Sequence, residues 1–130
     1  MKPQELRIGN LVYLVLENSP NIKEQHIVEP TTLMMLTGEV NSKGTYLDPI
    51  PLTEEWLLKF GFEYNIKRYY HPTTMLFELF NVSALHGGFK IIAGRKEKNI
   101  ILQISHPIKH VHQLQNIYFA LTGEELIIKE

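Results

Sequence analysis

Two histidines, His106 and His110, come closest to the pattern of a metal site. They are four residues apart, and on a helix this spacing presents two imidazoles on the same side, where they can bind one metal ion. Zinc sites usually contain about four protein ligands, however, and the predicted helix adds no carboxylate or cysteine to the pair. We therefore favour a solvated polar face, expect no metal and no cofactor, and keep a metal-dependent enzyme as the third hypothesis.

Other arrangements typical of catalysis are also missing from the sequence. Gly87 and Gly88 are not followed by the lysine and hydroxyl residue of a phosphate-binding loop. Ser83 and Ser105 lack the flanking glycines that expose a nucleophilic serine. Cysteine is absent from the chain, which excludes disulfides, thiolate metal sites and cysteine nucleophiles. The sequence thus predicts no catalytic residues and a protein that is not an enzyme.

Basic residues gather in the second half of the chain, although the net charge is −1. Residues 1–65 contain five Lys/Arg and nine Asp/Glu, whereas residues 66–130 contain eight and five. A basic surface beside aromatic rings can bind the phosphates and bases of a single nucleic-acid strand. The candidate contacts are Lys67, Arg68, Arg95, Lys96 and Lys98. Nucleic-acid binding is the alternative hypothesis and is not favoured, because the overall acidic balance opposes many simultaneous phosphate contacts.

Length and hydropathy indicate an ordinary folded domain. The 130 residues are 44% hydrophobic and 21% charged, which is typical of a globular protein, so we expect a single domain. The opening sequence MKPQELRIGN lacks the apolar segment of a signal peptide. Apolar runs such as Leu11–Leu16 are too short to cross a bilayer. We therefore expect a cytoplasmic protein without membrane contact.

The first fifty residues show mostly strand patterns. Leu11–Leu16 is apolar on both faces and predicts a covered strand, and the turn formers of Glu17–Asn21 should end it. His26–Glu29 and Thr45–Leu47 predict short strands, while Leu33–Leu36 fits either a helical turn or a strand. Residues 1–50 are thus a β-rich portion that could form a separate lobe from residues 51–130.

A short helix after Pro51 carries both a start and a stop signal. Thr53 is expected to be the N-cap, with its hydroxyl accepting a backbone N–H of the first turn. Leu52 and Leu57 occupy the positions of a hydrophobic staple. Gly61 fits the left-handed position after the last turn, and Phe62 can then fold back on Leu57.

The remaining residues predict strands and a second helix. Four short apolar runs with turn residues between them indicate an antiparallel meander; they begin at Phe62, Met75, Phe89 and Ile100. A helix is expected from about His106 to Thr122, with apolar residues at helical spacing on one side. The predicted fold class is α+β, with a β-rich N-terminal portion, a helix, the meander and a helix packed on one sheet face.

Three tracts resemble a known family. ELRIGN at residues 5–10, PIPLTEEWLLKFGF at residues 49–62 and HQLQNIYFALTGEEL at residues 112–126 resemble small uncharacterised proteins from anaerobic gut bacteria and their prophages and mobile elements. The resemblance implies a bacterial or phage protein of the cytosol, and it implies no activity, ligand or site residue. The sequence RIGNLVYLV is also similar to the first strand of an SH3-like small barrel, which concerns the fold alone.

Our favoured functional hypothesis is a non-catalytic binding or accessory protein of a phage or mobile element. It would act through contacts with an unknown protein partner, and the sequence leaves its oligomeric state open. Large aromatic residues such as Trp56, Phe60 and Tyr118 are typical of interfaces. A domain of this size needs most of them in its core, however, so the sequence does not indicate which surface binds.

Overall fold

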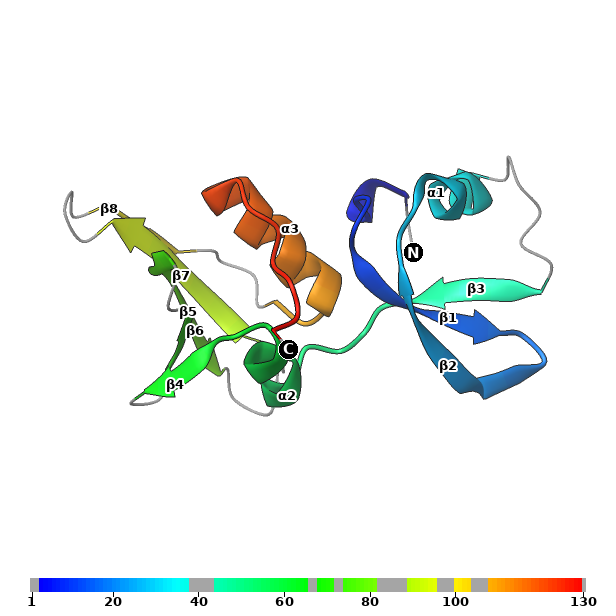
Figure 1. Ribbon diagram of the computed structural model, residues 1–130, viewed down its shortest axis with the longest axis horizontal. Coiled ribbons are helices and arrows are strands. Elements are labelled where there is room, and N and C mark those ends of the chain that lie inside the picture. Colours follow the sequence, from blue (N-terminus) through cyan, green and yellow to red (C-terminus); the bar gives the residue numbers. More distant parts are fainter. Residues whose placement is uncertain are drawn as a thin grey trace. The chain divides into compact units, whose positions relative to one another are not determined.

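The computed structural model describes residues 3–37, 44–65, 68–71, 74–81, 89–95, 100–103 and 108–129. The chain has the predicted α+β fold and forms two compact units (Figure 1). The first unit comprises Met1–Pro51 and His110–Ile117, and the second comprises Leu52–Lys109 and Tyr118–Glu130. The predicted lobes, 1–50 and 51–130, differ from these units chiefly in the placement of residues 110–117.

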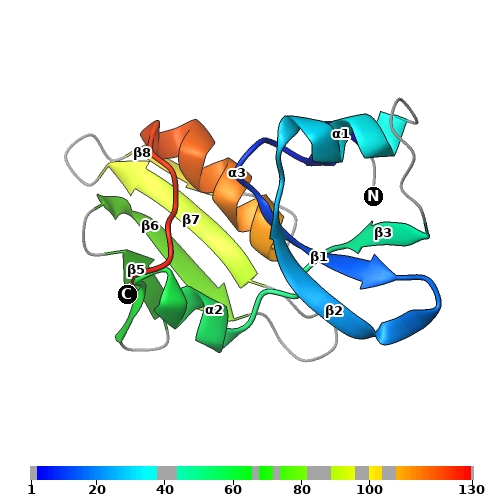
Figure 2. The same cartoon turned by 45° about the vertical axis from the view of Figure 1, so that its right-hand side comes forward.

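The first unit is a three-stranded antiparallel sheet with a helix on one face (Figure 2). Its strand order is β2-β1-β3. In chain order its elements are η1 (Pro3–Glu5), β1 (Leu11–Leu16), β2 (Ser19–Ile27), α1 (Pro30–Thr37), β3 (Thr45–Asp48) and the N-terminal part of α3 (Val111–Thr122). Leucines of α1 pack against a core of apolar side chains from the sheet and its flanking segments, namely Leu6, Val12, Val28 and Leu47. This packing decides the ambiguity of residues 33–36 in favour of a helix.

The strand at Leu11–Leu16 is confirmed, but two neighbouring predictions were wrong. The expected turn at Glu17–Asn21 is shorter, because Ser19 already pairs with Leu16 across an irregular register. The turn formers at 19–21 are accommodated because β2 lies at a sheet edge, where residues without a ladder hydrogen bond are tolerated. The expected strand at His26–Glu29 is the end of this longer strand, which stops at Ile27.

The second unit contains a five-stranded antiparallel meander of order β4-β5-β6-β7-β8. Its strands are β4 (Glu63–Asn65), β5 (Arg68–His71), β6 (Thr74–Asn81), β7 (Phe89–Arg95) and β8 (Ile100–Gln103). The predicted meander is confirmed with one more strand than expected, because β4 and β5 form a hairpin in which Asn65 pairs with Arg68. Two helices accompany it, α2 (Glu54–Lys59) and the C-terminal part of α3 (Val111–Thr122).

Helix α2 ends as the sequence predicts but begins differently. Gly61 has a φ of 88°, and its N–H donates to the carbonyl of Leu58 while that of Phe62 donates to Leu57, both over 3.0 Å. This pair of hydrogen bonds is the Schellman motif. Thr53 is the N-cap residue, but its hydroxyl makes no capping hydrogen bond. Two glutamates in the first turn supply the favourable negative charge there instead.

Helix α3 begins later than predicted, at Val111. Ile108 is in extended conformation and exchanges two backbone hydrogen bonds with Phe89, of 2.7 and 2.8 Å. His110 then acts as the N-cap residue, and its N–H donates to the side-chain oxygen of Gln113 over 3.1 Å. The helix ends at Thr122, as expected, followed by Gly123 with a φ of 75°.

Candidate functional site

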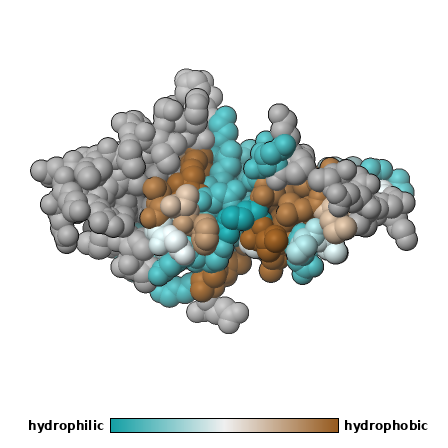
Figure 3. Space-filling view, turned by 90° about the horizontal axis from the view of Figure 1, so that it is seen from above, coloured by the Kyte–Doolittle hydropathy of each residue, from teal (hydrophilic) through white to brown (hydrophobic). Residues whose placement is uncertain are grey.

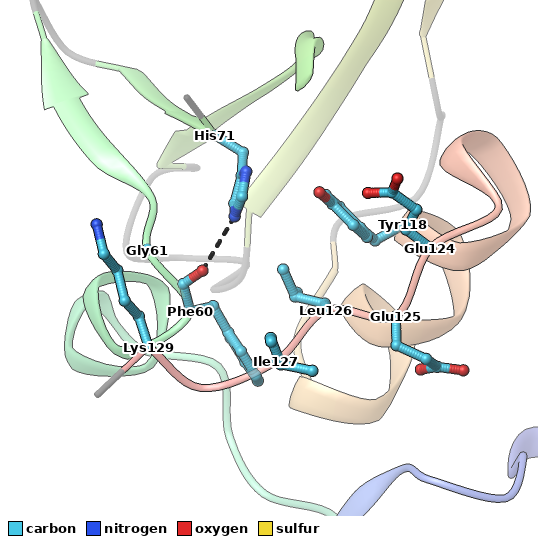
Figure 4. Close-up of a pocket in the computed structure, with 9 residues that line it drawn as sticks. All are labelled: Phe60, Gly61, His71, Tyr118, Glu124, Glu125, Leu126, Ile127 and Lys129. Carbon is cyan, nitrogen blue, oxygen red and sulfur yellow. Dashed lines mark hydrogen bonds between the residues drawn. The ribbon is translucent and has the colours of Figure 1, made fainter. Parts of the chain in front are cut away.

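A pocket of about 310 Å³ opens in the second unit at the C-terminal end of α2 (Figure 4). Side chains from α2, β5, α3 and the C-terminal segment surround it. The lining residues are Phe60, Gly61, His71, Tyr118, Glu124, Glu125, Leu126, Ile127 and Lys129. No single stretch of the sequence contains this group, so the pocket is formed by the tertiary structure.

Rings and an aliphatic side chain form the buried walls of the pocket. Phe60, Tyr118 and Leu126 are almost entirely buried. The imidazole of His71 lies against the Tyr118 ring, with centroids 5.4 Å apart, and meets the Phe62 ring edge-on at 5.1 Å. Its Nε2 is 3.1 Å from the carbonyl oxygen of Phe60, which holds the ring beside the end of α2. The pocket therefore has a mainly aromatic and apolar interior.

The C-terminal segment forms the remaining wall because two sets of hydrogen bonds fix its course. Thr122 Oγ1 donates to the carbonyl of Tyr118 over 2.6 Å and accepts from the backbone N–H of Glu124 over 3.1 Å. Further along, the N–H of Lys129 donates to the carbonyl of Lys59 over 2.6 Å. Between these anchors Leu126 turns inward, whereas Ile127 is 72% exposed.

Ionisable groups lie around the rim of the pocket. Burial lowers the pKa of His71, and the nearby Lys129 ammonium lowers it further; the Phe60 hydrogen bond and the Glu124 carboxylate oppose this shift. The imidazole is therefore neutral at neutral pH. In Figure 4 the Lys129 amine and the Glu124 carboxylate lie at opposite ends of the pocket, whereas the Glu125 carboxylate points away from its aromatic wall.

A second side-chain contact, partly buried, connects the meander to α2. The hydroxyl of Tyr69, on β5, donates to the carboxylate of Glu54 in the first turn of α2. Burial raises the pKa of Tyr69, and the hydrogen bond to Glu54 raises it further. The Tyr69 ring also meets Phe89 of β7 edge-on, with centroids 6.0 Å apart. Together with His71, this residue fixes β5 against the helix and so gives the pocket a rigid side.

A second candidate is the face of the first unit's sheet that α1 does not cover. Leu14 and Leu47 pair directly and belong to the α1 side, so their neighbours along each strand face the opposite way. We call this opposite side the open sheet face. Its exposed or partly exposed residues are Tyr13, Lys23, Gln25, Ile27, Tyr46 and Asp48, whereas Leu11 and Val15 on the same side are buried. Hydrophobic atoms reach the surface of both units (Figure 3, brown).

Two charged side chains on the open sheet face, Lys23 and Asp48, form an ion pair. The Lys23 ammonium lies 2.9 Å from an Asp48 carboxylate oxygen and 5.7 Å from the centre of the Tyr13 ring. The hydrogen bond to Asp48 raises the pKa of Lys23. The positive charge of Lys23 and the negative charge of Asp48 offset each other on this face. On the same face Tyr46 of β3 is 41% exposed and Ile27 of β2 is 57% exposed, on opposite sides of β1. The face is thus an apolar and aromatic surface without net charge.

The first unit also has a buried polar cluster around Gln115 of α3. Its side-chain oxygen accepts from the backbone N–H of Leu11 over 2.7 Å and from the Asn10 amide over 3.5 Å, and its amide donates to the Gly9 carbonyl over 3.4 Å. Asn10 also donates to the side-chain oxygen of Asn116 over 2.8 Å. These contacts attach α3 to the start of β1, which is a structural role.

Of the two histidines predicted to lie on one side of a helix, only His110 is among the described residues. His110 precedes the helix, and His106 lies outside the described residues. His110 stacks on His112, with ring centroids 5.7 Å apart and an angle of 12° between the planes. Burial, followed by the charge of His110, lowers the pKa of His112 to about 4. Across the part of the chain that the structure describes, no three histidine or acidic side chains group into a metal site.

The structure describes two of the five basic residues that were predicted to contact nucleic acid. Arg68 lies on β5 opposite Phe80 of β6, and Arg95 lies on β7 opposite Ile100 of β8. The other three candidates, at positions 67, 96 and 98, fall outside the described residues. The strand positions do not put the two arginines next to each other, and the nucleic-acid interface stays a prediction.

Comparisons with known proteins identify no family for the chain. No model of a known protein family matches the sequence, and no match was found among curated proteins or solved structures. The resemblance to the gut-bacterial family therefore stays a prediction. Within the described ranges, every helix is too short or too polar to cross a membrane.

Proposed function

We propose that the protein is a non-catalytic binding protein that contacts another protein through its open sheet face. The observation that carries this proposal is the exposure of Ile27 and Tyr46, with the partly exposed Tyr13 between them, on the sheet face opposite α1. Exposed aliphatic and aromatic side chains that lie together mark interaction sites more often than scattered ones do. Tyrosine suits such a site because it combines a large apolar ring with a hydroxyl that can hydrogen-bond.

The charges of the face define the chemistry of the partner. Lys23 and Asp48 already neutralise each other, so an approaching surface gains little from a net charge of either sign. The complementary surface is an apolar patch of a folded protein, with hydrogen-bonding groups at its edge. Interfaces of this kind have an apolar centre and a polar rim. The Lys23–Asp48 pair would form part of that rim.

The cellular setting that we propose follows from the resemblance of the three sequence tracts. This resemblance supports the proposal that the protein lies in the bacterial cytoplasm and acts as an accessory factor of a prophage or mobile element. The partner is then a protein of the host or of the element itself.

A photo-crosslinking experiment in bacterial cells tests the proposal. A photoreactive amino acid replaces Tyr46 in one variant and Leu58 in a control. Leu58 lies on α2 and is 56% exposed, so it is similarly accessible but away from the open sheet face. We expect one protein to be crosslinked at position 46 and not at position 58. The absence of a product at position 46, or the same products from both positions, would contradict the proposal.

The nucleic-acid alternative is tested separately by a gel-shift titration at low and moderate salt. We expect no salt-sensitive binding of single-stranded DNA or RNA. Binding that weakens with salt and disappears on replacing Arg95 and Lys96 by alanine would favour the alternative, because phosphate contacts release counterions.

A further inference from the structure

We propose that the pocket at the end of α2 binds a small organic cation, an alkylammonium ion whose apolar tail packs against Phe60 and Leu126. This site belongs to the second unit and is independent of the protein contact proposed for the open sheet face. It rests on the walls of the pocket, on the placement of its charges and on its volume.

Aromatic walls favour a cation with an apolar tail. The rings of Phe60, His71 and Tyr118 line the pocket, and His71 and Tyr118 lie against each other. The faces of aromatic rings attract an ammonium group, more strongly when water is excluded. Because the imidazole is held neutral by its buried position, it adds no repulsive charge. The buried Leu126 offers an apolar surface for the tail of the ligand.

The charged groups around the pocket also favour a positively charged ligand. The charged residues of the lining are Glu124, Glu125 and Lys129, and in Figure 4 the Glu125 carboxylate points away from the rings, so Glu124 is the acidic group beside the aromatic wall. Figure 4 shows Glu124 beside Tyr118 and the Lys129 amine at the opposite end. A bound ammonium would therefore lie between the Tyr118 ring and the Glu124 carboxylate, with its tail directed toward Phe60. An anion in that place would face Glu124 without a compensating group.

The volume limits the ligand to a small molecule. At about 310 Å³, the pocket is at the lower end of the range of ligand sites, roughly 300–1,000 Å³. A chain of a few carbons with one amino group fits this space. The test therefore uses n-butylammonium as the probe, and n-butanol and n-butyrate as probes of the same length that are neutral and negative.

The experiment is a titration of the whole protein followed by two-dimensional NMR of the backbone amides near neutral pH. We expect n-butylammonium to shift the signals of Gly61, Leu126 and Ile127 in a saturable manner, whereas n-butanol and n-butyrate have little effect. Glu124→Gln should weaken binding by about 2- to 5-fold, the range for a partly exposed ion pair. The control Glu55→Gln, on exposed α2 surface outside the pocket, should bind like the wild type.

Three results would overturn the proposal. One is the absence of saturable shifts at these amides with n-butylammonium. Another is binding of n-butyrate or n-butanol that equals or exceeds that of the cation. The third is equal affinity of the wild type and Glu124→Gln, which would show that the carboxylate does not contact the ligand. Circular dichroism of each variant confirms that it is folded before the titration.

Discussion

His71 Nε2 donates a hydrogen bond to the carbonyl oxygen of Phe60 over 3.1 Å, so β5 is attached to the residue that ends α2. Carbonyl groups in the last turn of a helix have no donor within the helix. The imidazole supplies one here, and the same contact holds one wall of the pocket in place. The carbonyl oxygen determines that the proton is on Nε2 in the neutral ring.

Replacing His71 by leucine should lower the free energy of unfolding by about 1–2 kcal/mol, the cost of leaving a buried acceptor unpaired. His71→Gln should lose less, because its amide can donate from a similar position. Urea unfolding monitored by circular dichroism measures both. If His71→Leu unfolds at the same urea concentration as the wild type, the hydrogen bond does not stabilise the second unit.

His112 should make the protein less stable in acid. It is buried, and its Nδ1 has no hydrogen-bond partner among the described residues. Its folded-state pKa of about 4 lies below the unfolded value of about 6.5. The unfolded state therefore binds the proton first as the pH falls. This contribution to stability is complete above about pH 6.5 and is lost progressively toward pH 4, by about 1–3 kcal/mol.

The His112→Leu variant isolates this effect. Leucine fills a similar space without a titrating group, so the variant should lose less stability than the wild type between about pH 7 and pH 4.5. His71, whose pKa is also lowered, keeps its contribution in both proteins and cancels in the comparison. Urea unfolding at the two pH values gives the difference. An equal loss in both proteins would mean that His112 is not shielded from water.

Gln115→Leu should destabilise the first unit by about 2–4 kcal/mol, because it removes the acceptor of the Leu11 N–H and of the Asn10 amide. The exposed Gln25 on β2 provides a matched control, and Gln25→Leu should change stability by less than about 0.5 kcal/mol. Thermal unfolding of both variants distinguishes them. Similar melting temperatures for the two would show that the Gln115 cluster is hydrated rather than buried.

Gly61→Ala should cost about 1–2 kcal/mol, because a φ of 88° is unfavourable for a residue with a Cβ atom. The added carbon would lie 3.5 Å from Lys129 Cδ and 3.6 Å from His71 Nε2, which are ordinary contact distances. The penalty is thus conformational, and Gly61→Asn should cost less, since asparagine tolerates the left-handed region better. Equal losses for Ala and Asn in urea unfolding would point to crowding instead.

The sequence predicts well those elements whose start and end are set by residues close to them in the chain. Helix α2 is specified by Leu52, Leu57 and Gly61 within a few residues of one another, and its predicted end at a left-handed Gly61 is confirmed. The start of α3 depends on a distant residue, because Phe89 pairs with Ile108 and keeps it extended. The hairpin of β4 and β5 was missed because Arg68–His71 shows no alternation of polar and apolar residues.

The candidate pocket was not predictable because its residues come from four separate segments. Phe60 and Tyr118 were assigned to the core, and both are indeed buried. The role of His71 depends on the Phe60 carbonyl, which no sequence pattern reveals. The open sheet face was not predicted, because Leu11–Leu16 is apolar on both faces. Its exposure depends on which side α1 covers, and that is set by the tertiary structure.

The affinity of the crosslinked partner for two surface variants tests the central claim most directly. Ile27→Lys places a charge on the open sheet face, and Leu58→Lys places one at an equally exposed position on α2. Isothermal titration calorimetry should show that Ile27→Lys weakens binding by at least about tenfold, as expected for an apolar residue inside an interface, while Leu58→Lys stays within about twofold of the wild type. Unchanged affinity of Ile27→Lys would contradict the claim that this face binds the partner.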